Sequence, residues 1–255
     1  MKYLEFSPNK ELSSLIYNYW VFEIPQSEEI VSSIQHFSIP DPCVSIVIIN
    51  QPYFNGVRIL GQHTSAYHQE IYPNSIFLGI RFHPWVVFNE RYIDKIKTLN
   101  STAEASPEIE THFKSMLGRK RQTDFSDFTE LDTALKNFVD EIKPGIDPLT
   151  RYICIKLSNE ESISEITNSI HLSKRNIQKS FKKSAGVTMK QYSSSVRQRK
   201  IWEKILTKEL SPHSAILEHG FFDQAHFINS FKKKTKLTPK EFREYHNKIN
   251  LSLLK

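Results

Sequence analysis

The chain has 255 residues, 39% of them hydrophobic, and a formal net charge of +6. This composition supports packed cores for two domains of ordinary size and excludes a disordered chain. No apolar run approaches the roughly 20 residues of a membrane helix, and no basic-then-apolar signal layout opens the chain, so we expect a cytoplasmic protein without a membrane partner. Two cysteines, Cys43 and Cys154, are too few for a disulfide framework.

The charge is distributed unevenly along the chain. Residues 147–255 contain 21 Lys and Arg against 10 Asp and Glu, whereas residues 1–146 contain 13 against 18. A basic half beside an acidic half predicts that the basic half contacts a polyanion. The alternative is that the lysines only provide solubility; it is disfavoured because much of their charge lies on two predicted helix faces.

Residues 1 to about 81 are predicted to be mixed in structure, with much β-strand. Residues 12–21 have helical apolar spacing and predict one short helix. Apolar or β-branched runs at 44–49, 57–60 and 76–82, punctuated by Gly and Pro, predict strands. Together they indicate a small sheet or barrel.

Helical spacing follows from residue 84 onward. We predict helices at 85–96, 107–117 and 125–142, the last with a long apolar stripe. This stripe either packs within its own domain, which we favour, or pairs with a second copy of the chain in a homodimer. Residues 143–148, with two prolines and a glycine, predict a linker. The predicted domains are 1–143 and 147–248.

Aromatic residues near the predicted strands admit two interpretations. They either line a pocket for a small organic effector or fill the core, and the sequence favours neither. The residues in question are Tyr53, Phe54, Tyr67, Tyr72 and Trp85. Which residues would bind an effector is unknown from the sequence.

The sequence offers little that predicts a metal, a cofactor or catalysis. His63 and His68 are five residues apart, so on a strand they would point to opposite faces. Ser193–Ser195 lacks the glycines of a nucleophile elbow, and we find no phosphate-binding glycine loop. We therefore expect no cofactor and no enzyme activity.

After a predicted helix at 151–157, the C-terminal half contains two similar units. The first, at about 162–183, has a capping box of Ser162 and Glu165, and Ser173 as the N-cap of its second helix. The spacing of Ile177 and Phe181 directs them inward. A helix predicted at 196–208 joins this unit to the second.

The second unit, at about 211–233, repeats the pattern with an offset of 50 residues. It has a turn at Gly220, an N-cap at Asp223, and Phe227 and Phe231 on one inward face. In both units a short helix, a turn and a second helix with outward donors indicate a helix-turn-helix whose second helix enters a DNA major groove. The candidate DNA-binding residues are Ser173, Lys174, Arg175, Gln178, Lys179, Lys182, Gln224, Ala225, His226, Asn229, Lys232 and Lys233.

The residue types suggest different roles for these positions. Arg175 and Gln178 have the donors that can read base edges, whereas lysines such as Lys179 and Lys182 suit phosphates. In the second unit His226 and Asn229 are the candidates for bases. As single exposed helix residues they would be unremarkable, and the repeat is what favours the DNA interpretation.

The two units resemble the DNA-binding domain of the AraC/XylS family of bacterial transcription regulators. The matching residues are Gly220–Phe221, Asp223–Phe227, Phe231–Lys232 and Thr238–Pro239, with Ser173, Arg175, Phe181, Gly186 and Tyr192 in the first unit. The departures include His171 and Lys236, which replace glycines of the family's turns. A non-Gly residue at positive φ costs about 1 kcal/mol, so we expect these turns to be reshaped or strained.

The resemblance implies an α+β protein in which a β-rich sensor or dimerisation domain with helices precedes an all-α domain of two helix-turn-helix units joined by a helix. It implies a sequence-specific regulator, more often an activator than a repressor. Its partners would be double-stranded DNA, RNA polymerase, a small-molecule effector and a second copy of the chain. The alternative is a ligand-sensing or protein-interaction regulator whose DNA-binding half is degenerate.

Overall fold

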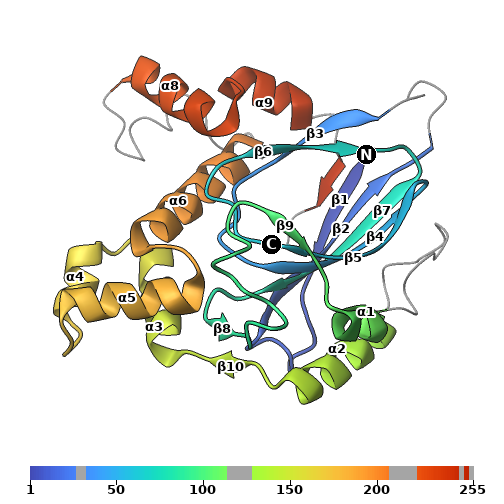
Figure 1. Cartoon of the computed structure of the whole chain (residues 1–255). Coiled ribbons are helices and arrows are strands. Elements are labelled where there is room, and N and C mark those ends of the chain that lie inside the picture. Colours follow the sequence, from blue (N-terminus) through green and yellow to red (C-terminus); the bar gives the residue numbers. More distant parts are fainter. Residues whose placement is uncertain (27–32, 114–127, 207–222, 247–249, 253–255) are drawn as a thin grey trace.

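The computed structural model describes residues 1–26, 33–113, 128–206, 223–246 and 250–252. It has a β-rich N-terminal region beside a helical C-terminal region, as the sequence predicts (Figure 1). Within the described residues, no helix combines the length and the apolar character needed to cross a membrane.

A seven-stranded sheet forms the centre of the N-terminal region. In spatial order its strands are β11 (Asn250–Ser252), β1 (Lys2–Phe6), β2 (Ile16–Ile24), β7 (Ser75–Phe82), β4 (Ser45–Gln51), β5 (Phe54–Leu60) and β9 (Thr102–Glu104). Neighbouring strands are antiparallel except β11, which runs parallel to β1 and places Asn250 opposite Lys2. Residues near the C-terminus therefore join the sheet in which the chain begins.

Two short ribbons accompany this sheet. One pairs β3 (Ile34–Ser38) with β6 (Tyr67–Ile71), and the other pairs β8 (Val86–Val87) with β10 (Gly145–Ile146). Strand β10 lies in the segment predicted as a linker, and the next residue, Asp147, caps the helix that follows by accepting from Leu149 and Thr150. The junction between the two regions is therefore held by backbone pairing and a helix cap.

The two faces of the main sheet have different partners. Because side chains alternate along a strand, residues such as Tyr19, Ile46 and Ile80 share one face. They pack in one core with α1 (Pro107–Phe113) and α2 (Thr129–Ile142). The apolar stripe of α2 is buried in this core through Leu131, Leu135, Phe138 and Ile142, so it packs within its own region.

The C-terminal region consists of helices around two small cores. The described helices are α3 (Pro148–Ser158), α4 (Ile163–Asn168), α5 (Lys174–Ala185), α6 (Met189–Leu206), α8 (Gln224–Thr235) and α9 (Pro239–His246). Helix α6 contributes Tyr192 to the core of the first unit and Trp202 to the core of the second. It runs between the two units, with α5 near one end and α9 near the other (Figure 1).

The strands predicted at 44–49, 57–60 and 76–82 are present as β4, β5 and β7, but two helix predictions were wrong. Residues 12–21 form a turn and then enter β2, because pairing with both β1 and β7 outweighs a weak helical pattern. Residues 85–96 form β8 and turns. The side chains of Asn89 and Asp94 accept from backbone N–H groups two residues later, which favours turns over a helix.

Candidate nucleic-acid interface and the cavity beside it

The first helix-turn-helix is built by local signals that the sequence announces. Ser162 accepts from the backbone of Glu165 and Glu165 accepts from the backbone of Ser162, which confirms the predicted capping box of α4. Ser173 accepts from Asn176 N–H and caps α5. These caps satisfy backbone donors that a helix start would otherwise leave unpaired, so they fix where each helix begins.

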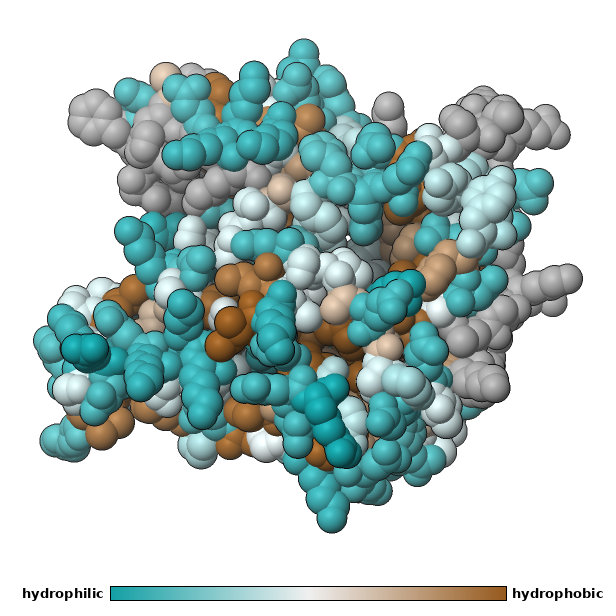
Figure 2. All heavy atoms as spheres, viewed as in Figure 1, coloured by the Kyte–Doolittle hydropathy of each residue, from teal (hydrophilic) through white to brown (hydrophobic). Residues whose placement is uncertain are grey.

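Helix α5 separates a buried face from an exposed one as predicted. Ile177 and Phe181 are 0% exposed. All six candidates of the first unit are exposed: Ser173, Lys174, Arg175, Gln178, Lys179 and Lys182. The helix contains no Asp or Glu, so its outer surface offers donors and positive charge to an anionic partner. Figure 2 shows hydrophilic side chains over this helix.

The second unit is described in part. Residues 207–222, which include its predicted first helix and the turn at Gly220, lie outside the described residues, as do the side chains of Gln224 and His226. In α8 the candidates Ala225, Asn229, Lys232 and Lys233 are exposed, whereas Phe227 and Phe231 are buried. The described part of α8 therefore divides into faces in the same way as α5.

The two unusual turn residues behave differently. Lys236 has φ 62°, and its N–H donates to the carbonyl of Lys232 at the end of α8. This confirms the expected strain, since an L-residue in the left-handed region costs about 1 kcal/mol. His171 is not among the described residues with positive φ, so this turn is the reshaped alternative of the two expected outcomes and not the strained one. The turn before Ser173 is formed by a bend of ordinary handedness.

The N-terminal region holds the far end of α5. The side-chain amide of Gln62 donates to the carbonyl of Ala185 at 2.7 Å. The ammonium of Lys95 donates to the carbonyls of Pro84, Val86 and Ser184, the last at 3.1 Å. Cationic and amide donors at a helix C-terminus satisfy its free carbonyls and complement its dipole. The position of α5 is therefore fixed by groups from the other region.

The second unit also contacts the N-terminal region, through α9 and β3. The hydroxyl of Tyr245 accepts from the N–H of Phe37 at 3.1 Å and lies 2.7 Å from Nδ1 of His36. The Phe37 ring packs edge-on against Phe242, which belongs to the core of the second unit together with Trp202. Both helix-turn-helix units are thus attached to the same N-terminal region.

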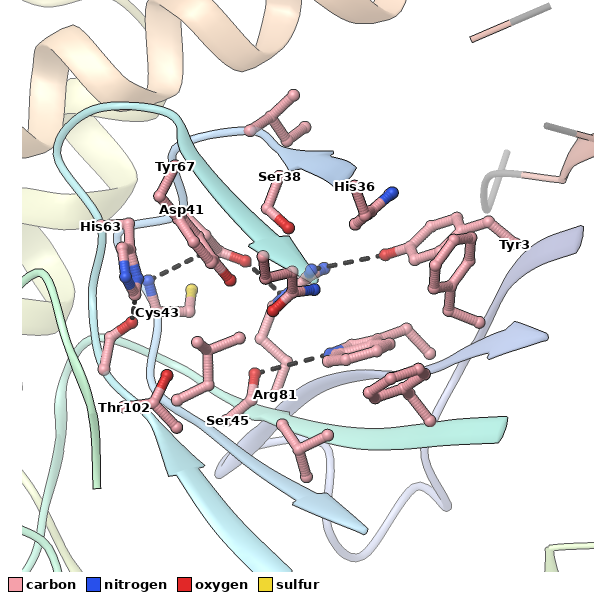
Figure 3. Close-up of a pocket in the computed structure, with 18 of the residues that line it drawn as sticks. Tyr3, His36, Ser38, Asp41, Cys43, Ser45, His63, Tyr67, Arg81 and Thr102 are labelled. Carbon is pink, nitrogen blue, oxygen red and sulfur yellow. Dashed lines mark hydrogen bonds and ion pairs between the residues drawn. The ribbon is translucent and has the colours of Figure 1, made fainter. Parts of the chain in front are cut away.

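A cavity lies against the second face of the main sheet. The register places Glu5 opposite Trp20, Trp20 opposite Gly79, and Arg81 opposite Ser45, so their side chains share that face. The β3–β6 ribbon and the α6 residues Arg199 and Trp202 complete the wall around a volume of about 180 Å³. Figure 3 shows Tyr3, Asp41, Cys43, Tyr67 and Arg81 around this space.

Charged groups are concentrated at one part of this wall. Glu5 Oε1 accepts from Arg81 at 3.0 Å and from Arg199 at 2.9 Å, and Arg81 Nε lies 2.7 Å from an oxygen of Asp41. Burial raises the pKa of Glu5, but the two guanidinium groups outweigh burial and lower its pKa to about 2. The carboxylate is therefore ionised at neutral pH, and it ties a strand of the first region to a helix of the second.

Most of the aromatic residues that the sequence suggested for an effector pocket lie outside this cavity. Of these five, Tyr67 lines the cavity, stacked on His63 with ring centres 3.9 Å apart. Tyr53 is 82% exposed and pairs with Tyr72 at the surface, and the Trp85 indole donates to the carbonyl of Ser14. Sequence reasoning missed Glu5, Arg199 and Trp202. A carboxylate within the apolar run YLEF hints at a buried partner but does not identify it.

Comparison with known families and proteins gives matches to both regions. A family model described as a helix-turn-helix domain matches residues 166–245, and one described as a domain of unknown function (DUF6597) matches residues 4–89. The probable transcription factor PqrA of Proteus vulgaris is 32% identical over 104 residues, which are 39% of this chain and 83% of PqrA.

The bifunctional transcriptional activator and DNA repair enzyme AdaA of Bacillus subtilis is 26% identical over 99 residues. The match covers 39% of this chain and 47% of AdaA, about half its length. Among solved structures, ToxT of Vibrio cholerae with a bound unsaturated fatty acid has a TM-score of 0.42 at 11% identity, covering 98% of this chain and 96% of ToxT. The C-terminal domain of AraT from Geobacillus stearothermophilus has a TM-score of 0.36 at 18% identity, covering 43% and 92%.

Proposed function

The chain belongs to the AraC/XylS family of transcription regulators, and we propose that it reads specific DNA sequences with both of its helix-turn-helix units. The observation that supports this most strongly is the outer face of α5. It is an unbroken exposed row of Arg, Gln and Lys without a carboxylate, held by the buried Ile177 and Phe181. A degenerate DNA-binding half is not expected to retain such a face. The alternative of a ligand-sensing or protein-interaction regulator that does not bind DNA is therefore disfavoured.

The roles within the interface follow from side-chain chemistry. Arg175 and Gln178 are proposed to bond the edges of bases, since each offers two hydrogen-bonding atoms to a guanine or adenine. Lys179 and Lys182 are proposed to contact phosphates, which fixes the register and makes affinity depend on salt. In α8, Asn229 and His226 are proposed for bases, and Lys232 and Lys233 for phosphates.

The arrangement around α6 supports reading by a single chain at two places. If α5 and α8 enter successive major grooves on one face of the duplex, the two contacts lie about 34 Å or roughly 10 base pairs apart. Because the two units are different in sequence, the site would be long and asymmetric. Activation of transcription with RNA polymerase, and a homodimer through the N-terminal region, are proposed on family membership alone.

Substitution of Arg175 tests the proposal. After the bound sequences are selected from genomic fragments, Arg175→Ala should lose discrimination at one or two base pairs, worth about 1–3 kcal/mol per base pair. Lys182→Ala, on the same exposed face, is the matched comparison. It should weaken binding to all sequences alike and reduce the salt slope by about 1. Equal weakening on every sequence by Arg175→Ala would make it a phosphate contact, and recovery of no motif would contradict specific reading.

We also propose that the cavity binds a small organic effector. Its volume of about 180 Å³ and its mainly apolar wall with a few polar groups are typical of ligand sites. An apolar cavity of about 150 Å³ is enough to hold benzene, so a molecule of one or two rings would fit. Isothermal titration of the full chain with small aromatic compounds tests this, and failure of every compound to bind would contradict it.

A further inference from the structure

The charged groups in the cavity wall already balance one another. Arg81 is paired with Glu5 and Asp41, and Arg199 is paired with Glu5. Arg58, a third cation of the wall, pairs at the surface with Glu104 at 3.5 Å, and the Glu104 side chain is 87% exposed. Within the buried part of the wall, the two guanidinium groups of Arg81 and Arg199 are therefore matched by the two carboxylates of Glu5 and Asp41. Removing one partner from a buried pair leaves an uncompensated charge, which is strongly destabilising.

This balance selects the charge of a ligand. An anion would compete with Glu5 or Asp41 for the guanidinium groups, and a cation would compete with Arg81 or Arg199 for the carboxylates. In either case a buried group would lose its partner. An uncharged ligand leaves the pairs intact and uses the rest of the wall, where Trp20 and Phe77 supply flat apolar surface. The geometry therefore favours an uncharged aromatic molecule.

The wall that α6 provides connects the cavity to both DNA-binding units. Arg199 and Trp202 are three residues apart, so they lie on one face of the helix. The Trp202 ring lies 5.9 Å from that of Phe242 and 6.3 Å from that of Phe231, in the core behind α8. About two turns before Arg199, Tyr192 of the same helix is part of the core behind α5. A shift of α6 would therefore change the positions of both α5 and α8, the second helices of the two helix-turn-helix units.

We propose that an uncharged aromatic ligand in this cavity regulates DNA binding by changing the position of α6, with the Glu5–Arg199 ion pair as the link between the two regions. This inference rests on the proposed DNA-binding function and on the proposed effector cavity. A ligand that contacts Trp202 binds with different affinity to different positions of α6, which is the condition for regulation. The ion pair determines how far α6 can move from β1.

The ligand class is tested with three probes that share one ring system. Indole is uncharged, indole-3-acetate carries one negative charge, and tryptamine carries one positive charge at neutral pH. Isothermal titration of the full chain should show indole binding at least about tenfold more tightly than either charged probe, a difference of about 1.4 kcal/mol. Val47→Phe places a larger side chain in the cavity and should abolish indole binding. Tighter binding of a charged probe, or no binding of indole, would overturn the ligand class.

The link is tested by measuring DNA affinity of the full chain with and without saturating indole. In the wild-type chain the ligand should change the Kd for the selected DNA by about fivefold or more, in either direction. In Arg199→Gln, with indole raised to the saturating concentration found by titrating that variant, the Kd for DNA should no longer respond to the ligand. Arg197→Gln is the matched control, because Arg197 is exposed on the same helix and should keep the full response.

Two further variants keep this test decisive if Arg199→Gln does not fold. Arg199→Lys preserves the charge and should retain part of the response, whereas the double variant Glu5→Gln with Arg199→Gln buries no unpaired charge and should lose it. A full response in the double variant would refute the ion pair as the link. Failure of the wild-type chain to bind any selected DNA would instead contradict the proposed function, and the indole titration would still report on the cavity.

Discussion

Lys95 offers a sharp test of how the two regions are joined. Its side chain is 7% exposed and donates to three carbonyls, one of them at the end of α5. Burial disfavours the charged form and lowers the pKa of Lys95 from its ordinary 10.5 to about 8. No described carboxylate forms an ion pair with its ammonium group at contact distance, so the charge is compensated mainly by carbonyl dipoles.

The direction of the pH effect follows from these values. Between about pH 8 and 10.5 the unfolded chain retains the proton on Lys95 while the folded chain has lost it, so the free energy of unfolding should rise with pH. A tenfold change in proton affinity corresponds to about 1.4 kcal/mol, so the full contribution is about 3 kcal/mol. The cost of burying the charge is present at neutral pH and disappears at the upper end of this window.

The assay compares urea unfolding of the wild-type chain and Lys95→Met from about pH 7 to 10.5. The free-energy difference between the two should move in favour of the wild-type chain by about 3 kcal/mol across this range. Ionising tyrosines affect both chains equally and cancel in the difference. Lys97→Met is the matched control, since the Lys97 side chain is 84% exposed, and it should follow the wild-type curve. A difference that stays constant with pH would refute the assignment of a buried, protonated Lys95.

Three substitutions and one control variant probe other contacts. Gly186→Ala should destabilise the chain in urea unfolding by about 1 kcal/mol because Gly186 has a φ of 79°. Overpacking should add about 1–3 kcal/mol, since the new Cβ would lie 2.3 Å from Gln62 Nε2. Unchanged stability would contradict the close packing at this position. Gly79→Ala would place a Cβ 1.9 Å from the Trp20 ring and should alter tryptophan fluorescence and weaken indole binding. Gly145→Ala is the control, because the nearest atom to its new Cβ lies at an ordinary 3.8 Å. It should change neither the tryptophan fluorescence nor indole binding, and equal effects of Gly79→Ala and Gly145→Ala would contradict the close approach of Trp20 to Gly79. Tyr245→Phe removes the acceptor of the Phe37 N–H and should speed amide exchange in β3. The free energy of unfolding should fall by about 1–3 kcal/mol, because a buried donor loses its partner. Equal exchange rates would show that α9 is held by its ring contacts alone.

The sequence alone determined the helical C-terminal region and the faces of its helices. Ser162, Glu165 and Ser173 act on backbone groups within three residues of themselves, and Ile177 and Phe181 are one turn apart, so short-range patterns are sufficient to place them. The three strand runs were predicted for the same reason. The charge asymmetry between the two halves follows from the positions of the charged residues along the sequence.

Only the tertiary structure decided how the regions meet. Glu5 and Arg199 are 194 residues apart and Gln62 and Ala185 are 123 apart, and no local pattern encodes such pairs. The same is true of β11 beside β1, and of residues 12–21, where strand pairing on both sides overrode a helical spacing. A buried ion pair depends on which side chains the fold brings within about 4 Å, and that is set by packing rather than by any one segment.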